Sequence, residues 1–250
     1  MRRFCLLTSA NSNPKLAKGM GRGYLSYVLH LAPHTLSGYQ VCPAADGCEI
    51  PCLNTAGHGG IAAGGVITYA ALAAGARNAV QAARIRKTRG FFEARSAFMA
   101  DLVWDIEGAL EEARRLGMRA CFRLNGTSDI RWERVACARA GKAYANIMAA
   151  FPRVQFYDYT KLSNRRDLPA NYHLTFSLGV KNDLAAWAAL GAGLNVAVVF
   201  DRYRERPAEF MGRAVIDGDE SDLRFADPLG VIVGLKSKGH ARHDRSGFVR

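Results

Sequence analysis

The amino-acid sequence predicts an α/β fold, and within that class a partial (β/α) barrel of about six parallel strands. Short β-rich runs alternate with helical runs over most of the chain, and several of the β-rich runs are apolar on both faces, as in a parallel sheet. The residues that follow the strands are unusually polar. This favours a barrel, because parallel strands deliver their carboxyl-terminal loops to one end. With 250 residues, such a barrel is expected to be one domain, residues 1–250.

Runs rich in β-forming residues predict the strands. We expect them to be parallel and to be joined by right-handed crossovers. They cover residues 24–32, 118–124, 153–158, 171–177, 194–200 and 230–235, with a further β-rich run at 212–218.

Helical patterns occupy most of the stretches between these strands. The strongest pattern covers 91–117, where apolar residues recur with helical spacing until Gly117. An Ala-rich segment at 61–83 predicts one or two helices interrupted at Gly75, and further helices are expected at 135–151 and 182–191. The loop 33–60 is too long to be a simple connection.

The composition is that of a globular protein with a basic surface. Hydrophobic residues make up 49% and charged residues 22% of the chain, which is enough for a sizeable core. The formal net charge of +12 favours nucleic acid or a phosphorylated small molecule as a partner, although a solvated basic surface has the same composition. Basic residues gather at 84–89 and in a tail at 236–250.

No segment is typical of secretion or of membrane insertion. The apolar run near the amino terminus is too short for a signal peptide, and the most apolar stretch, 61–76, is too short to span a bilayer. A cytoplasmic protein with no membrane association and with reduced cysteines is therefore expected. Cys5, Cys121 and Cys137 lie in strand or helix patterns and are expected to be buried.

Three further cysteines lie close together in the loop 33–60. Cys42, Cys48 and Cys52 are separated by five and by three residues, and an odd number of thiols cannot form a closed set of disulfides. One interpretation is a structural zinc ion with His34 or His58 as the fourth ligand. A second is an iron-sulfur cluster with one iron free for a small molecule, and a third is cysteines without a shared role.

Polar side chains follow four of the predicted strands, and we expect them to converge on one site. Arg123 lies in an otherwise apolar strand and needs a buried partner, which Asp129 or Asp158 is expected to supply. A turn followed by a helix N-cap would explain residues 125–129 equally well. The polar residues at the strand ends include Asn125, Gly126, Thr127, Ser128, Asp129, Asp158, Lys161 and Ser177.

An acidic segment at 217–227 stands out in this basic chain. Its oxygen ligands suit a divalent cation, but its spacing lacks the glycine and the terminal glutamate of an EF-hand loop. A solvated loop is therefore expected, and pairing with the basic stretch 84–89 is a second interpretation.

Long segments of the chain resemble the gene product 88 family of phage, plasmid and bacterial proteins. The resemblance spans nearly the whole sequence. Its segments are LTSANSNPKLAKG, VCPAADGCEIPCLNTAG, ARIRKTRGFF, RLNGTSDI, FYDYTK, PANYHLTFS, VIDGDESDLRFADP and GVIVGLKSKG.

A more distant resemblance concerns mechanism. A three-cysteine loop after the first strand, Asn-Gly-Thr-Ser-Asp after the second and Tyr-Thr-Lys after the third are similar to radical S-adenosylmethionine enzymes, although the cysteine spacing is longer than usual there. The resemblance implies a six-stranded partial barrel in which Cys42, Cys48 and Cys52 hold a [4Fe-4S] cluster and S-adenosylmethionine binds the fourth iron. It implies cofactor contacts for residues 125–129 and for Ser177. Asp129, Asp158 and Lys161 are the expected catalytic groups.

Three hypotheses follow. The leading one is an iron-sulfur enzyme of the radical S-adenosylmethionine type that acts on a nucleic acid or a nucleotide-like substrate. The first alternative is a zinc-stabilised nucleic-acid-binding protein without catalysis, and the second is a base-exchanging barrel enzyme with Asp129, Asp158 or Asp219 as nucleophile. A histidine directed at the three sulfurs would favour zinc, whereas an open cavity facing Asn125 and Asp129 would favour a cluster with a cofactor.

Overall fold

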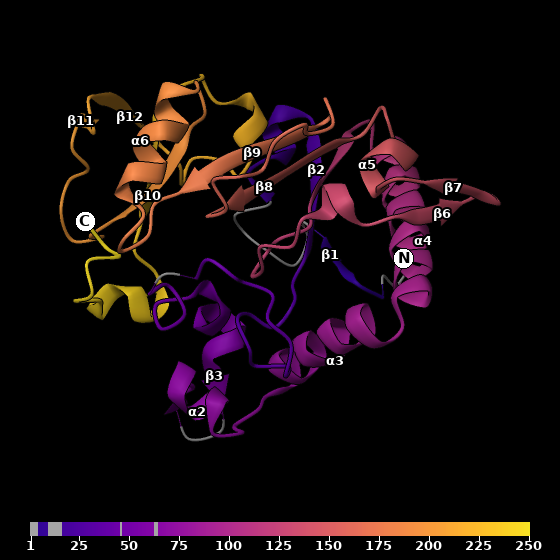
Figure 1. The fold of residues 1–250 in the computed structure, drawn as a ribbon, viewed down its shortest axis with the longest axis horizontal. Helices are drawn as coiled ribbons and strands as arrows, with labels where there is room; N and C mark the ends of the chain where they lie inside the picture. Colours follow the sequence, from indigo (N-terminus) through magenta and orange to yellow (C-terminus); the bar gives the residue numbers. More distant parts are fainter. Residues whose placement is uncertain (1–4, 10–16, 46, 63–64) are drawn as a thin grey trace.

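A computed structural model describes residues 5–9, 17–45, 47–62 and 65–250 of the chain (Figure 1). The fold is mixed α/β and is built on a large, mostly parallel sheet of nine strands. In spatial order the strands are β1 (Leu7–Ser9), β2 (Tyr24–Leu29), β5 (Arg119–Arg123), β8 (Gln155–Thr160), β9 (Tyr172–Ser177), β10 (Val196–Phe200), β13 (Ile232–Lys236), β12 (Arg213–Asp217) and β11 (Glu209–Phe210).

The six predicted strands all form, and they lie side by side in chain order. β2, β5, β8, β9, β10 and β13 pair in parallel, and β12 adds a further parallel strand beside β13. β1 and β11 pair antiparallel at the two edges. Among the described residues no pairing joins the two edges, so the sheet is not a closed barrel.

Helices cover one face of the sheet. α4 (Arg95–Arg115) packs against β2 and β5, and α6 (Asp183–Gly191) packs against β9 and β10 (Figure 1). Alternate residues of each strand point to this face and form the main core, among them Tyr27, Phe122 and Phe156. α3 (Ala79–Glu93) precedes α4 and packs against it.

The opposite face of the sheet is covered by the chain itself. The 3-10 helix η6 (Arg224–Ala226) contacts β8 and β9, and Cys121, Tyr157 and Leu223 form a small apolar cluster there. Polar side chains of the strands also point to this side, because side chains alternate along a strand.

The prediction of a helix at 135–151 is wrong. β6 (Cys137–Arg139) and β7 (Lys142–Tyr144) form a hairpin, and only the short α5 (Ile147–Ala150) follows. Ala140 and Gly141 both have positive φ, 49° and 75°, which is the backbone of a two-residue hairpin turn. The alanines of this segment suggested a helical period that the turn interrupts.

The other helical predictions hold with different boundaries. The expected helix at 91–117 is divided into the end of α3 and the whole of α4, and α3 begins at Ala79, where Asn78 accepts a hydrogen bond from the backbone N–H of Gln81. In the Ala-rich segment, β3 (Ile61–Ala62) pairs with β4 (Gly65–Val66), and α2 (Tyr69–Ala73) stops before Gly75. No described helix is both long enough and apolar enough to span a membrane.

Candidate functional site

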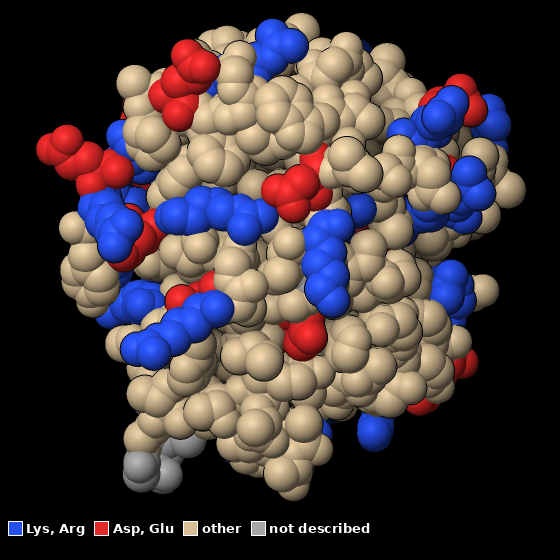
Figure 2. Space-filling model, turned by 60° about the vertical axis from the view of Figure 1, so that its left-hand side comes forward, with Lys and Arg blue, Asp and Glu red and all other residues tan. Residues whose placement is uncertain are grey.

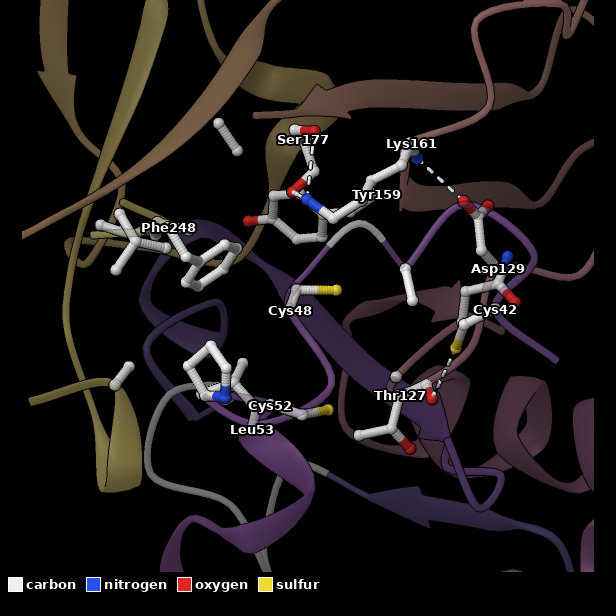
Figure 3. Close-up of a pocket in the computed structure, with 18 of the residues that line it drawn as sticks. Cys42, Cys48, Cys52, Leu53, Thr127, Asp129, Tyr159, Lys161, Ser177 and Phe248 are labelled. Carbon is white, nitrogen blue, oxygen red and sulfur yellow. Dashed lines mark hydrogen bonds between the residues drawn. The ribbon is translucent and has the colours of Figure 1, made fainter. Parts of the chain in front are cut away.

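A cavity of about 210 Å³ lies at the carboxyl ends of the parallel strands (Figure 3). Its walls come from the cysteine loop, the loop after β5, the ends of β8, β9, β10 and β13, and the carboxyl-terminal segment. The structure brings together every predicted site residue except Asp158. The predicted residues that line the cavity are Cys42, Cys48, Cys52, Asn125, Gly126, Thr127, Ser128, Asp129, Lys161 and Ser177.

Helix α3 holds the cysteine loop in place. Gln81 Nε2 donates to the backbone carbonyls of Asn54 (2.9 Å) and Gly59 (2.7 Å), and Arg84 Nη1 donates to the Asn54 carbonyl at 2.9 Å. The loop packs so closely that a Cβ on Gly59 would lie 2.3 Å from the Asn54 oxygen. Arg84 therefore positions the segment that carries Cys52.

The loop after β5 is organised around Asn125. Its side-chain oxygen accepts hydrogen bonds from Ser128 Oγ (2.9 Å), the Ile130 N–H (2.9 Å) and the Trp132 indole (3.1 Å). Gly126 donates its N–H to the Leu29 carbonyl at 2.9 Å. A Cβ at Gly126 would lie 2.7 Å from that same oxygen, so this close approach of the loop to β2 requires glycine.

Backbone contacts join the two loops. The N–H of Asp129 donates to the carbonyl of Val41 at 2.8 Å, and the Cys42 thiol lies 3.8 Å from the carbonyl oxygen of Thr127. The segment 125–129 is thus a bend in the chain, and it forms a wall of the cavity. The helix N-cap expected within it is wrong, because the helix that follows is the 3-10 helix η5 (Trp132–Arg134), whose N-cap is Arg131 without a side-chain hydrogen bond.

The three thiols of the cavity are protonated when no metal or cluster is bound. Burial raises the pKa of Cys42 and of Cys48 to about 12, and it also raises the pKa of Cys52. Backbone N–H groups point at two of the sulfurs: His34 N–H lies 3.4 Å from Cys42 Sγ, and Asn54 N–H lies 3.5 Å from Cys52 Sγ.

Neither predicted histidine is directed at the sulfurs. His34 Nδ1 lies 2.9 Å from the Tyr69 hydroxyl and 3.2 Å from Thr35 Oγ1, and His58 is exposed and does not line the cavity. Among the described residues, no group of three or more His, Cys, Asp or Glu side chains is arranged as a preformed metal site. Of the remaining cysteines, Cys121 and Cys137 are buried as expected, whereas the prediction that Cys5 is buried is wrong, since Cys5 is exposed.

Asp129 is buried at the cavity wall and is held on both carboxylate oxygens. Oδ1 accepts from Thr160 Oγ1 at 2.8 Å and lies 3.4 Å from Arg165 Nη1, while Oδ2 accepts from the Lys161 N–H at 2.8 Å. Burial raises the pKa of Asp129, although these donors oppose the shift. The Lys161 ammonium donates to Ser177 Oγ at 3.2 Å, as Figure 3 shows.

The family model described as "Gene product 88" matches residues 6–250 of the chain. The chain belongs to the gene product 88 family. No curated protein and no solved structure matches it.

Asp158, the predicted site residue that does not line the cavity, lies beneath the loop after β5 of this gene product 88 chain. Its Oδ1 accepts from the Asn125 N–H at 2.6 Å and its Oδ2 accepts from the Tyr172 hydroxyl at 2.7 Å. Neither Asp158 nor Asp129 is the ion-pair partner of Arg123, so that prediction is wrong. Arg123 pairs with Asp222, with 3.4 Å between Nη1 and Oδ2.

The acidic segment is not a solvated loop, and the basic stretch 84–89 is not its partner. Asp222 is 2% exposed and Arg224 is 1% exposed, because the segment folds against the inner face of the sheet, which is the face opposite α4 and α6. Cations from other parts of the chain, together with Arg224 of the segment itself, neutralise it. The ion pairs are Arg22–Glu220, Arg123–Asp222, Arg206–Asp217, Arg206–Asp219, Lys238–Asp219 and Arg224–Asp227.

Arg165 and Phe248 are among the residues of the site that were not predicted from the sequence. Arg165 pairs with Asp129 and Glu133 and donates to the Tyr172 hydroxyl at 3.0 Å, so it links the loop after β5 to β9. Phe248 lines the cavity from the tail, with its ring centroid 5.2 Å from the Lys161 ammonium nitrogen. Neither residue belongs to a local motif, so only the fold identifies them.

Proposed function

We propose that this gene product 88 protein is an iron-sulfur enzyme of the radical S-adenosylmethionine type that acts on a nucleic acid or a nucleotide-like substrate. Within this proposal, β2, β5, β8, β9, β10 and β13 are the six strands of a partial barrel. Their parallel pairing in chain order supports it, as does the position of the cysteine loop after the first of them.

One observation carries the proposal. The three cysteines share a cavity with the polar loop 125–129, and neither histidine that a zinc site would need faces it. Three thiolates would leave one iron of a cubane cluster without a protein ligand and able to bind a small molecule. An open cavity beside that position gives such a molecule room.

The surroundings of the thiols fit a cluster bound by thiolates. Arg84 and Lys161 lower the pKa of Cys52, and Lys161 lowers that of Cys48, against the larger effect of burial. The N–H groups of His34 and Asn54 point at sulfur, as donors that tune clusters do. Cys42, Cys48 and Cys52 would therefore hold the cluster, which together with S-adenosylmethionine supplies one-electron chemistry.

The other residues of the cavity would bind and orient the cofactor and substrate. Residues 126–129 present backbone groups and the Thr127 and Ser128 side chains beside Cys42, where an amino acid moiety would be held. Lys161 and Ser177 add a cation and a hydroxyl on the opposite wall. Phe248 and Leu53 add apolar surface to the lining of this space.

Anaerobic purification followed by iron and sulfide analysis tests the proposal. We expect a brown protein with about four iron and four sulfide per chain. Replacing Cys42, Cys48 or Cys52 by alanine should abolish the visible absorption and the bound iron. Cys137→Ala is the matched control, because Cys137 is a buried cysteine that does not line the cavity, and it should retain both.

The opposite outcome is equally clear. A colourless protein that holds one zinc ion per chain after anaerobic isolation and reconstitution would rule out the cluster and favour the zinc-stabilised alternative.

A further inference from the structure

The floor of the cavity contains buried polar atoms that the described chain leaves without partners. Arg123 of β5 and Tyr159 of β8 both line the cavity from the inner face of the sheet. Arg123 Nε and the Tyr159 hydroxyl have no hydrogen-bond partner among the described residues. Because a buried polar group without a partner destabilises a fold, two such donors at the floor of one cavity point to a ligand.

The ion pair that the guanidinium of Arg123 makes is long for a buried cation. Its contact with Asp222 is long, at 3.4 Å, and Asp222 also accepts from the Tyr157 hydroxyl at 3.3 Å. The guanidinium carbon lies 4.6 Å from the centroid of the Tyr159 ring, which fixes the orientation of the cation against the phenol. Arg123 therefore retains donor capacity towards the cavity.

Tyr159 is a donor and not a phenolate. Burial raises its pKa to about 12, so its hydroxyl keeps its proton at neutral pH. Figure 3 shows that this hydroxyl points into the cavity, on the side of Ser177 and Phe248.

The charges that line the cavity favour an anion. Arg123, Lys161 and Lys236 contribute cations, whereas both acidic side chains of the lining are already paired: Asp129 with Arg165, and Asp219 with Lys238 and Arg206. The ligand that satisfies an arginine and a phenol together is an oxyanion, a phosphate or a carboxylate, because both donors can bind its oxygens.

A small molecule fits this position better than a polymer. The unpaired donors lie at the floor of a cavity of about 210 Å³ and not along an open groove. On the face shown in Figure 2, acidic side chains lie between the Lys and Arg side chains, so no continuous basic track runs across it.

We propose that Arg123 and Tyr159 form the substrate subsite of the cavity and bind the oxyanion of a small nucleotide-like molecule. The identity of this molecule as the substrate rests on the proposed function, whereas the binding itself does not depend on the cluster.

Equilibrium binding measured by calorimetry at constant ionic strength tests the subsite. The probes are uridine 5′-monophosphate, uridine, inorganic phosphate, malonate and a single-stranded oligouridylate; a pyrimidine is used because adenine would also be bound wherever S-adenosylmethionine binds. We expect the monophosphate to bind much more tightly than uridine. Binding of malonate instead would identify a carboxylate as the oxyanion and would equally support the subsite.

Tyr159→Phe is the decisive variant, because it removes only a hydroxyl that has no partner in the described chain, and the fold should tolerate it. We expect it to weaken binding of the anionic probe about tenfold or more, as loss of a hydrogen bond to a charged group does. Arg123→Lys keeps the positive charge near Asp222 but loses the planar guanidinium, which can donate two hydrogen bonds to one oxyanion. It should weaken binding by a similar factor of about ten. Thr175→Val is the matched control: Thr175 pairs in register with Tyr159, its buried hydroxyl also has no partner among the described residues, and it does not line the cavity. It should bind like the unaltered protein.

Three results would overturn the subsite: no binding of any anionic small probe, equal binding by the Tyr159→Phe and Thr175→Val variants, or binding of the oligouridylate alone. These outcomes are separate from the fate of the proposed function. If the protein holds iron and sulfide but shows one of these results, the cluster is supported and the subsite is ruled out. If the protein is colourless but binds the monophosphate through Tyr159, the subsite is supported and the cluster is ruled out.

Discussion

Two buried aspartates organise the strand ends beside the cavity, and they do so in different ways. Asp129 faces the cavity and is surrounded by cations and donors, whereas Asp158 lies below it between Asn125 and Tyr172. Burial raises the pKa of Asp158 from 3.8 to about 7, because the hydrogen bonds from Tyr172 and Asn125 and the nearby arginines only partly offset the loss of water.

The raised pKa of Asp158 makes the stability of the fold depend on pH. The folded chain binds a proton at Asp158 more tightly than the unfolded chain, so this residue contributes stability that is fully present below about pH 4 and is lost as pH rises through about 7. We expect the free energy of unfolding in urea to fall over this range, and Asp158→Asn to remove that component. Asp101→Asn, at an exposed position of α4, is the control and should keep the original slope. Identical slopes for Asp158→Asn and the unaltered chain would contradict this assignment.

At the scale of elements, the cysteine loop depends on a helix that follows it in the chain. α3 binds the loop through Gln81 and Arg84, both of which contact the Asn54 carbonyl, and Thr88 of the same helix accepts a hydrogen bond from Ala32 N–H at 2.8 Å. Helix α3 thus holds the cysteine loop at both ends. Arg84, from the basic stretch 84–89, contributes to this through its contact with Asn54.

Removing the Arg84 side chain should release the part of the loop that carries Cys52. We expect Arg84→Ala to raise the amide hydrogen exchange of residues 52–60 about tenfold, since hydrogen bonds from a charged group contribute roughly 1.5–3 kcal/mol. Arg86→Ala is the matched control, because Arg86 lies on the same helix and is exposed. Mass spectrometry of the exchanged peptides measures the difference. Equal exchange in the two variants would show that α3 does not hold the loop through Arg84.

At the scale of the whole molecule, the carboxyl-terminal tail and the cysteine loop, which are far apart in the chain, line one cavity. The tail continues the sheet locally: Val249 pairs with Val199 of β10, and the Arg250 N–H donates to the Val199 carbonyl at 2.9 Å. Arg250 also pairs with Asp183 at the start of α6. This anchoring places Phe248 in the wall opposite the cysteine loop, so the predicted basic tail at 236–250 is part of the site.

Opening this wall should make the thiols reactive. In the chain without a cluster, burial raises the pKa of Cys48 and slows its alkylation. We expect Phe248→Ala to speed the modification of Cys48 by iodoacetamide several-fold at pH 8, measured by peptide mapping with buried Cys137 as the internal reference. Tyr203→Ala, at a side chain that is 72% exposed and outside the cavity, should leave the rate unchanged. An unchanged rate for Phe248→Ala would show that the tail does not shield the thiols.

The sequence predicted the parallel strands well because each is a short apolar run with polar residues at its end, as 194–200 and Asp201 show. It failed at 135–151, where a turn at Ala140 and Gly141 outweighs helix-favouring alanines. It also failed at Asp222, whose burial depends on Arg123, a residue that is distant in the chain.

The sequence by itself determined the six strands, the order in which their polar ends appear and the three cysteines in the first long loop. Local apolar patterns and turn residues suffice for this, because they act over a few positions. Only the tertiary structure decided which side chains share the cavity. It directed His34 to Tyr69, folded the acidic segment under the sheet and brought Phe248 opposite the thiols. Those arrangements arise from contacts between residues far apart in the chain, where burial and charge pairing, rather than local pattern, determine which partners meet.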